Sequence, residues 1–72
     1  MIELTLKEEF KVNFIPYLQR LISQEKTHYE WLDKHDEKLY PMVSVFKAKS
    51  EAFMSHLTQR LEEYIQYADR LP

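Results

Sequence analysis

The sequence predicts an all-α protein, an antiparallel helical hairpin preceded by a short N-terminal segment. Three observations predict this class: the 72 residues contain no glycine, the few prolines divide the chain into segments, and apolar residues recur at helical spacing within those segments. Without glycine, the tight turns that join β-strands lose the residue that reaches positive φ most easily. A sheet-rich fold is therefore disfavoured, and glycine-rich nucleotide-binding loops are excluded. We expect residues 1–72 to form a single helical domain.

The N-terminal segment, residues 1–13, has a pattern that fits more than one structure. Its first apolar residues alternate with polar ones, as in a strand. Thr5 followed by Glu8 instead fits a capping box, in which each side chain accepts a hydrogen bond from the backbone of the other residue at the start of a helix. We expect a short helix or turn over residues 6–12.

The first long helix is predicted over residues 14–34. Asn13 is a favourable N-cap residue, and Pro16 would then lie in the first turn, where its missing backbone donor costs little. Apolar residues beyond it follow helical spacing and give the helix one apolar face. The residues of this face are Ile15, Leu18, Leu21, Ile22, Tyr29 and Leu32.

A charged turn over residues 35–41 and a second long helix over residues 42–70 complete the predicted hairpin. The turn ends at Pro41 and contains no glycine, so we expect a kink or a wide bend rather than a tight loop. Pro72 ends the chain. The predicted apolar face of the second helix consists of Phe46, Phe53, Leu57, Leu61, Tyr64, Ala68 and Leu71.

Self-association is predicted because the apolar arc of the second helix is wider than contact with one neighbouring helix can cover. Met54 and Ile65 extend the arc on one side and Tyr67 extends it on the other. A homodimer that forms a four-helix bundle with twofold symmetry would bury this surplus. The residues expected to associate are Phe46, Phe53, Met54, Leu57, Leu61, Tyr64, Ile65 and Tyr67.

The alternative to the dimer is a monomer in which the N-terminal segment folds back over the open side of the hairpin. That arrangement would place Ile2, Leu6 and Phe10, which are spaced by four residues, over the exposed apolar arc.

Charge and cysteine content exclude several kinds of site. The chain has no cysteine, which excludes disulfides and thiolate zinc sites and suits a cytoplasmic protein. The formal net charge is −2, and its acidic and basic residues are evenly mixed, without the basic stripe that nucleic-acid binding needs. Apolar runs and polybasic clusters of the kind that bind membranes are also missing. The sequence therefore predicts a soluble protein with neither membrane nor nucleic acid as its main partner.

The stretch EKTHYEWLDKH, residues 25–35, contains the only candidate metal-binding pattern. Glu25 and His28 have the E-x-x-H spacing that places both side chains on one face of a helix, as in di-iron carboxylate bundles. The chain has one such motif, so a dimeric helical-bundle metalloprotein would have to draw the second motif from another copy. The alternative is that Glu25 lies at the edge of the core with its carboxylate in water. We expect no resident metal or cofactor.

A mixed aromatic stripe on the first long helix is the candidate binding site for a partner. Its residues are Tyr17, His28, Trp31 and His35. Aromatic side chains on a helix flank are typical of protein-binding surfaces, although Trp31 could also cover the edge of a small core. No residues have the arrangement of a catalytic dyad or nucleophile elbow. The sequence predicts a non-catalytic interaction module, such as a small regulator, inhibitor or adaptor. An RNA-binding helical hairpin is the architectural alternative.

Overall fold

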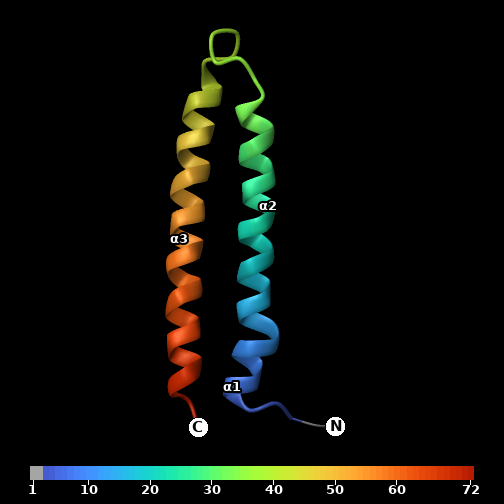
Figure 1. The fold of residues 1–72 in the computed structure, drawn as a ribbon, viewed down its shortest axis with the longest axis vertical. Helices are drawn as coiled ribbons and strands as arrows, with labels where there is room; N and C mark the ends of the chain where they lie inside the picture. The colour runs from blue at the N-terminus through green and yellow to red at the C-terminus, as the bar shows by residue number, and fades with distance from the viewer. Residues whose placement is uncertain (1–2) are drawn as a thin grey trace.

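The computed structural model describes residues 3–72, and within them it contains helices and no strand. The elements are α1 (Leu6–Glu9), the π-helical segment η1 (Phe10–Phe14), α2 (Ile15–Asp33) and α3 (Met42–Arg70). The first three follow one another without a break and form one arm of a hairpin, with α3 as the other arm (Figure 1). This confirms the predicted all-α helical hairpin.

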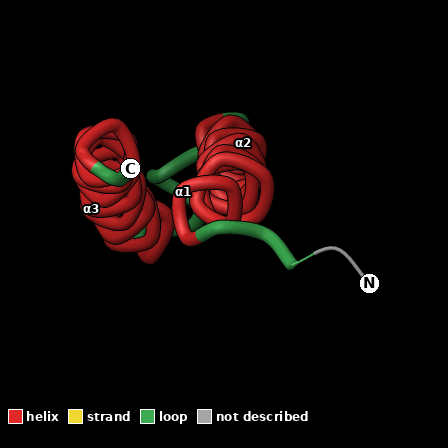
Figure 2. Tube along the Cα trace, turned by 90° about the horizontal axis from the view of Figure 1, so that it is seen from below, coloured by secondary structure: helices red, strands yellow, loops and turns green. Residues whose placement is uncertain are grey.

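The hairpin is long and thin. Its Cα trace measures 54 × 24 × 12 Å, and Figure 2 shows α2 and α3 side by side, with α1 at the end of the first arm. The radius of gyration is 16.6 Å. A compact domain of this length would have a value of about 11 Å. The two arms therefore enclose little interior volume.

The first arm begins at the predicted capping box. The backbone N–H of Glu8 donates to Thr5 Oγ1 at 3.2 Å, and the backbone N–H of Thr5 donates to Glu8 Oε1 at 3.3 Å. Both bonds satisfy amides that have no partner within the helix, so the helix begins at Leu6 as expected. Ile2 lies outside the described residues.

The chain does not start a new helix at Asn13, contrary to the sequence interpretation. Asn13 lies inside η1, and its Nδ2 donates to Glu9 Oε2 at 2.6 Å, so it caps nothing. The reason is Pro16, which has no N–H to donate and whose ring would press on the carbonyl of the preceding turn. In η1 the turn is widened, and the N–H of Ile15 reaches back to the oxygen of Phe10. The widened turn accommodates the proline without ending the helix.

The bend between the arms is built on Asp36. Its backbone oxygen accepts from the N–H groups of Leu39 and Tyr40 at 3.1 and 2.9 Å, and its Oδ1 accepts from the N–H of Lys38 at 2.9 Å. An aspartate can organise a turn in this way because its short side chain reaches backbone amides two residues on. No residue from 3 to 72 has positive φ, so the backbone of the bend needs no glycine.

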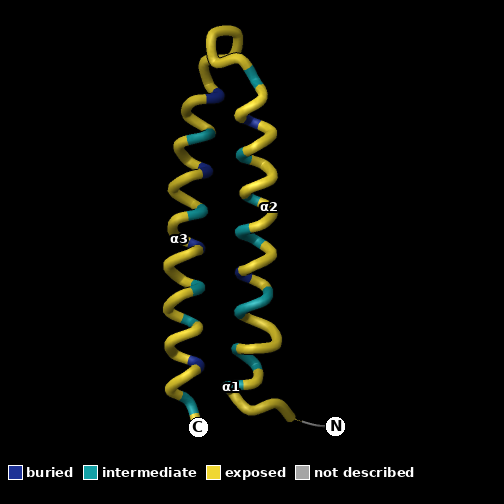
Figure 3. Tube along the Cα trace, in the orientation of Figure 1, coloured by how far each residue is buried: buried dark blue, intermediate teal, exposed yellow. Residues whose placement is uncertain are grey.

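The core is a single seam between α2 and α3, coloured dark blue and teal in Figure 3. On α3 the residues of the seam alternate at spacings of four and three, which is the period of a coiled coil. They are Val43, Lys47, Ser50, Met54, Leu57, Leu61, Tyr64, Ala68 and Leu71, all buried or half-buried. On α2 they are Ile15, Leu18, Ile22, Glu25, Tyr29 and Leu32.

The seam differs from the predicted apolar face of the second helix at its loop-proximal half. Phe46 and Phe53 were expected to face the first helix, but each remains 46% exposed. Lys47 and Ser50, which are polar, occupy the seam in their place. The seven-residue period of the seam decides this choice, because an arc centred on Phe46 and Phe53 would rotate Val43 and Met54 out of the contact.

Candidate interaction surface

One side of the hairpin carries most of the exposed aromatic side chains. Phe46, Phe53 and Tyr67 are separated by seven and fourteen residues, so they form one row on α3 directly beside the seam. On α2, His28 and His35 form the row beside the seam on the same side of the hairpin, and the row beyond it holds Tyr17 and Trp31. We call these seven residues the aromatic face.

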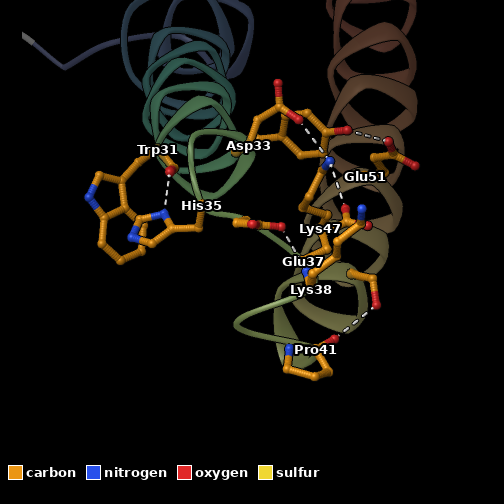
Figure 4. Close-up of polar contacts among 11 residues, drawn as sticks. Trp31, Asp33, His35, Glu37, Lys38, Pro41, Lys47 and Glu51 are labelled. Atoms are coloured by element: carbon orange, nitrogen blue, oxygen red, sulfur yellow. Dashed lines mark hydrogen bonds and ion pairs between the residues drawn. The ribbon is translucent and has the colours of Figure 1, made fainter.

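The loop end of the aromatic face is a connected cluster. The rings of Trp31 and His35 lie 4.4 Å apart, and those of His35 and Tyr40 lie 6.0 Å apart. His35 Nδ1 lies 2.9 Å from the backbone oxygen of Trp31, which fixes the imidazole against the indole (Figure 4). A hollow of about 410 Å³ opens beside them, and its lining residues are Trp31, His35, Tyr40, Met42, Val43 and Phe46.

The open end of the same face has a second aromatic cluster, centred on Phe10. Its ring lies 5.4 Å from Tyr64, 5.2 Å from Tyr67 and 5.2 Å from Phe14. The two contacts to tyrosine join the first arm to α3 in edge-to-face geometry, which aromatic pairs favour. A hollow of about 460 Å³ lies here, lined by Phe10, Glu63, Tyr64, Gln66, Tyr67 and Arg70.

The opposite side of the hairpin is polar near the loop. Lys47 Nζ donates to Asp33 Oδ1 at 2.7 Å and to Glu37 Oε1 at 3.2 Å, and these hydrogen bonds raise the pKa of Lys47 (Figure 4). Tyr29 Oη donates to Glu51 Oε1 at 2.8 Å, which raises the pKa of Tyr29 because the carboxylate stabilises the phenol. This side of the hairpin therefore carries charged and polar side chains near the loop, whereas the aromatic face carries rings.

The candidate metal pair is engaged in other contacts. Glu25 Oε1 accepts a 2.6 Å hydrogen bond from Ser50 Oγ across the seam and lies 3.4 Å from His28 Nδ1. The bond from Ser50, followed by the contact with His28, lowers the pKa of Glu25 against the opposing effect of burial. Within residues 3–72, no three histidine, aspartate or glutamate side chains are arranged to hold a metal ion.

The predicted partner stripe remains together in the structure. Tyr17, His28 and Trp31 are exposed and His35 is half-buried, all on the aromatic face. Ring contacts connect three of them, because the His28 and Trp31 rings stack at 6.2 Å and Trp31 contacts His35.

The predicted self-association residues fall into three groups in the structure. Phe46, Phe53 and Tyr67 lie on the aromatic face. Ile65 is exposed on the polar side, because it follows Glu51 by fourteen residues and shares its row. The remaining residues line the seam within one chain: Met54, Leu57, Leu61 and Tyr64.

Sequence reasoning missed Tyr40 and Met42 as parts of this surface, and it placed Phe10 over the apolar arc of the second helix only in the alternative in which the N-terminal segment folds back. Met42 precedes Phe46 by four residues, a spacing that already placed the two side chains together on a helix. Tyr40 had no such signal, since the path of the turn decides where its ring lies.

None of the helices within residues 3–72 has the length and apolar content needed to cross a membrane. Comparison of the chain with protein-family models, with curated proteins and with solved structures finds no match.

Proposed function

We propose that this chain is a non-catalytic protein-interaction module of the cytoplasm that acts through its aromatic face. The observation that carries this proposal is the placement of Trp31, Phe46, Phe53 and Tyr67, each between 46% and 56% exposed, on one side of the hairpin. Exposed aromatic clusters of this kind are characteristic of protein-binding surfaces, where large rings supply most of the binding energy.

The amount of exposed surface supports a second copy as one occupant of this face. The chain exposes 5895 Å². A folded monomer of its mass would expose about 4,800 Å². The excess of about 1,100 Å² exceeds the roughly 800 Å² that each partner buries in a standard interface. A homodimeric four-helix bundle would bring the surface of each chain into the ordinary range.

The test is sedimentation equilibrium of the wild-type chain and two single variants. Phe53→Ala removes a ring from the aromatic face, whereas Ile65→Ala removes a side chain of similar exposure (40%) from the polar side. We expect the wild type and Ile65→Ala to form dimers at micromolar concentration and Phe53→Ala to dissociate. Equal dissociation constants for the two variants would remove the aromatic face from the dimer contact.

A different protein is the competing occupant, and it would be recognised by the same residues. Capture from a cell extract with the wild type and with Trp31→Ala, each immobilised at equal density, distinguishes the two cases. If the wild type is monomeric and captures a protein that Trp31→Ala does not capture, then that protein, and not a second copy, is the partner of the aromatic face. A monomer that retains the same proteins in both forms would overturn the function proposed for the aromatic face.

A further inference from the structure

We infer that two copies pair through their aromatic faces in an antiparallel arrangement, with the loop end of one hairpin against the open end of the other. This inference rests on the proposed homodimer and adds its geometry. Two symmetric pairings of the face are possible. In one the hairpins run in parallel and α2 covers α3 of the other copy; in the other they are antiparallel and each helix covers its own equivalent.

Charge in the row beyond the aromatic residues distinguishes these pairings. Lys49, His56 and Glu63 follow one another at seven-residue spacing on α3, and Glu63 lies with Tyr67 in the hollow at the open end. Lys49 belongs to none of the ion pairs among residues 3–72, and Glu63 has only an exposed 3.4 Å contact with Arg60.

Within one chain Lys49 and Glu63 cannot meet, because fourteen residues of helix separate them by about 21 Å. An antiparallel copy of α3 centred on His56 brings each Lys49 against the Glu63 of the other chain, and twofold symmetry makes the pair twice. In the parallel arrangement Lys49 would instead face Gln24 and His28, and neither of these is acidic.

The aromatic row has the same centre of symmetry. Phe46 and Tyr67 lie at nearly equal distances on either side of His56, so antiparallel pairing places each Phe46 ring on Tyr67 of the other copy. Phe53 and Arg60 are related in the same way and would form a cation–π contact. Three pairs on one helix therefore share one centre.

The first arms of the two copies can pair about the same twofold centre. The Glu25–Ser50 hydrogen bond fixes the height of α2 against α3, and it places His56 level with residue 19. In the antiparallel dimer the two first arms therefore face each other at residue 19. Tyr17 of one copy then lies opposite Leu21 of the other, and His28 lies opposite Phe10. His28, Trp31 and His35 of the stripe would thus contact the open end of the other copy, whereas Tyr17 would lie near the centre of the dimer.

Cross-linking tests the arrangement directly, since the native chain has no cysteine. His56→Cys places a thiol at the proposed twofold axis, and Lys49→Cys places one a heptad away in the same row. With a short bismaleimide we expect His56→Cys to cross-link into a covalent dimer and Lys49→Cys to remain uncross-linked. Equal cross-linking of both variants would overturn the antiparallel arrangement, because parallel hairpins hold the two positions equivalently.

Charge reversal supplies a second measurement. Lys49→Glu and Glu63→Lys should each weaken the dimer about tenfold, since each turns two attractive contacts into repulsive ones. The double variant Lys49→Glu/Glu63→Lys should regain wild-type affinity, and circular dichroism checks that all three remain helical. If the wild type is dimeric but the double variant does not regain affinity, the antiparallel arrangement is wrong and the homodimer still stands. A wild type that is monomeric throughout would overturn the proposed homodimer itself.

Discussion

Ser50 Oγ donates a 2.6 Å hydrogen bond to Glu25 Oε1 in the middle of the seam between α2 and α3. Ser50 is only 4% exposed and Glu25 is half-buried, so a polar pair occupies a position where Leu18 and Leu32 lie one heptad away on either side. Sliding the arms by one heptad would place a leucine opposite Ser50 and leave the Glu25 carboxylate against an apolar side chain. A single buried polar contact of this kind specifies the register of a coiled coil.

Ser50→Ala should lower the free energy of unfolding by about 1 kcal/mol, because it removes the donor to a partly buried carboxylate. Urea denaturation followed by circular dichroism measures this change. The matched control is Ser55→Ala, an exposed serine of the same helix that should change stability by less than about 0.5 kcal/mol. The change in helix propensity is the same for both variants and favours alanine, so equal changes in stability would contradict a stabilising bond from Ser50 to Glu25.

Glu25 should also make stability depend on pH in the acid range. Folding lowers its pKa below the reference value of 4.5, so the unfolded chain binds the proton more readily than the folded chain. The resulting stabilisation is present above pH 4.5 and is lost as the pH falls through the lower pKa of the folded state.

Glu25→Gln should flatten this part of the curve of unfolding free energy against pH. Glu30→Gln, which changes an exposed glutamate of the same helix, should leave the curve unchanged. A wild-type curve without an acid slope, or one that Glu25→Gln leaves intact, would contradict the assignment to Glu25.

The hairpin could be predicted from the sequence, whereas the division of apolar residues between the seam and the exposed face could not. Helical spacing and Pro41 were sufficient to place two helices and a bend. The size and hydrophobicity of Phe46 and Phe53 predict that both are buried, but Lys47 and Ser50 occupy the seam beside Val43 and Met54. The pattern in the sequence that indicates the true seam is the uninterrupted alternation of four- and three-residue spacings from Val43 to Leu71.

The continuous first arm was missed for a different reason. Asn13 and Pro16 have the spacing of an N-cap and a first-turn proline, and local preference alone cannot distinguish that start from a widened turn inside a helix. Contact of Phe10 with the far end of α3 favours the continuous helix, and this contact joins residues that are distant in sequence. The aromatic face combines rows of side chains from both arms, so it depends on the alignment of the arms and not on the sequence of either arm alone.

Lys47 should stabilise the loop end of the hairpin rather than the molecule as a whole. Its ammonium contacts Asp33 and Glu37 and lies 5.6 Å from the centre of the Tyr29 ring. Lys47→Met keeps the length of the side chain and removes its charge, so amide exchange over residues 34–41 should become faster. Global stability should change little, because both carboxylates are solvent-exposed and water screens their attraction to the ammonium. Lys26→Met, an exposed control on α2, should leave exchange in the turn unchanged.

The Phe10 ring should hold the two arms together at the end of the hairpin away from the loop. Its ring is the contact of the first arm with both Tyr64 and Tyr67, and it belongs to the η1 segment, where the widened turn makes fewer regular helical bonds. Phe10→Ala should therefore destabilise the protein by about 2 kcal/mol, less than the loss of a fully buried phenylalanine because Phe10 is half-buried.

The loss should be local. Amide exchange should become faster over residues 6–14 in Phe10→Ala, while the amides of α2 beside Leu32 keep their protection. Val12→Ala is the control, because Val12 lies in the same segment and is 59% exposed. Uniformly faster exchange along both arms of Phe10→Ala would show that this end does not open separately, and that its aromatic cluster stabilises the whole seam.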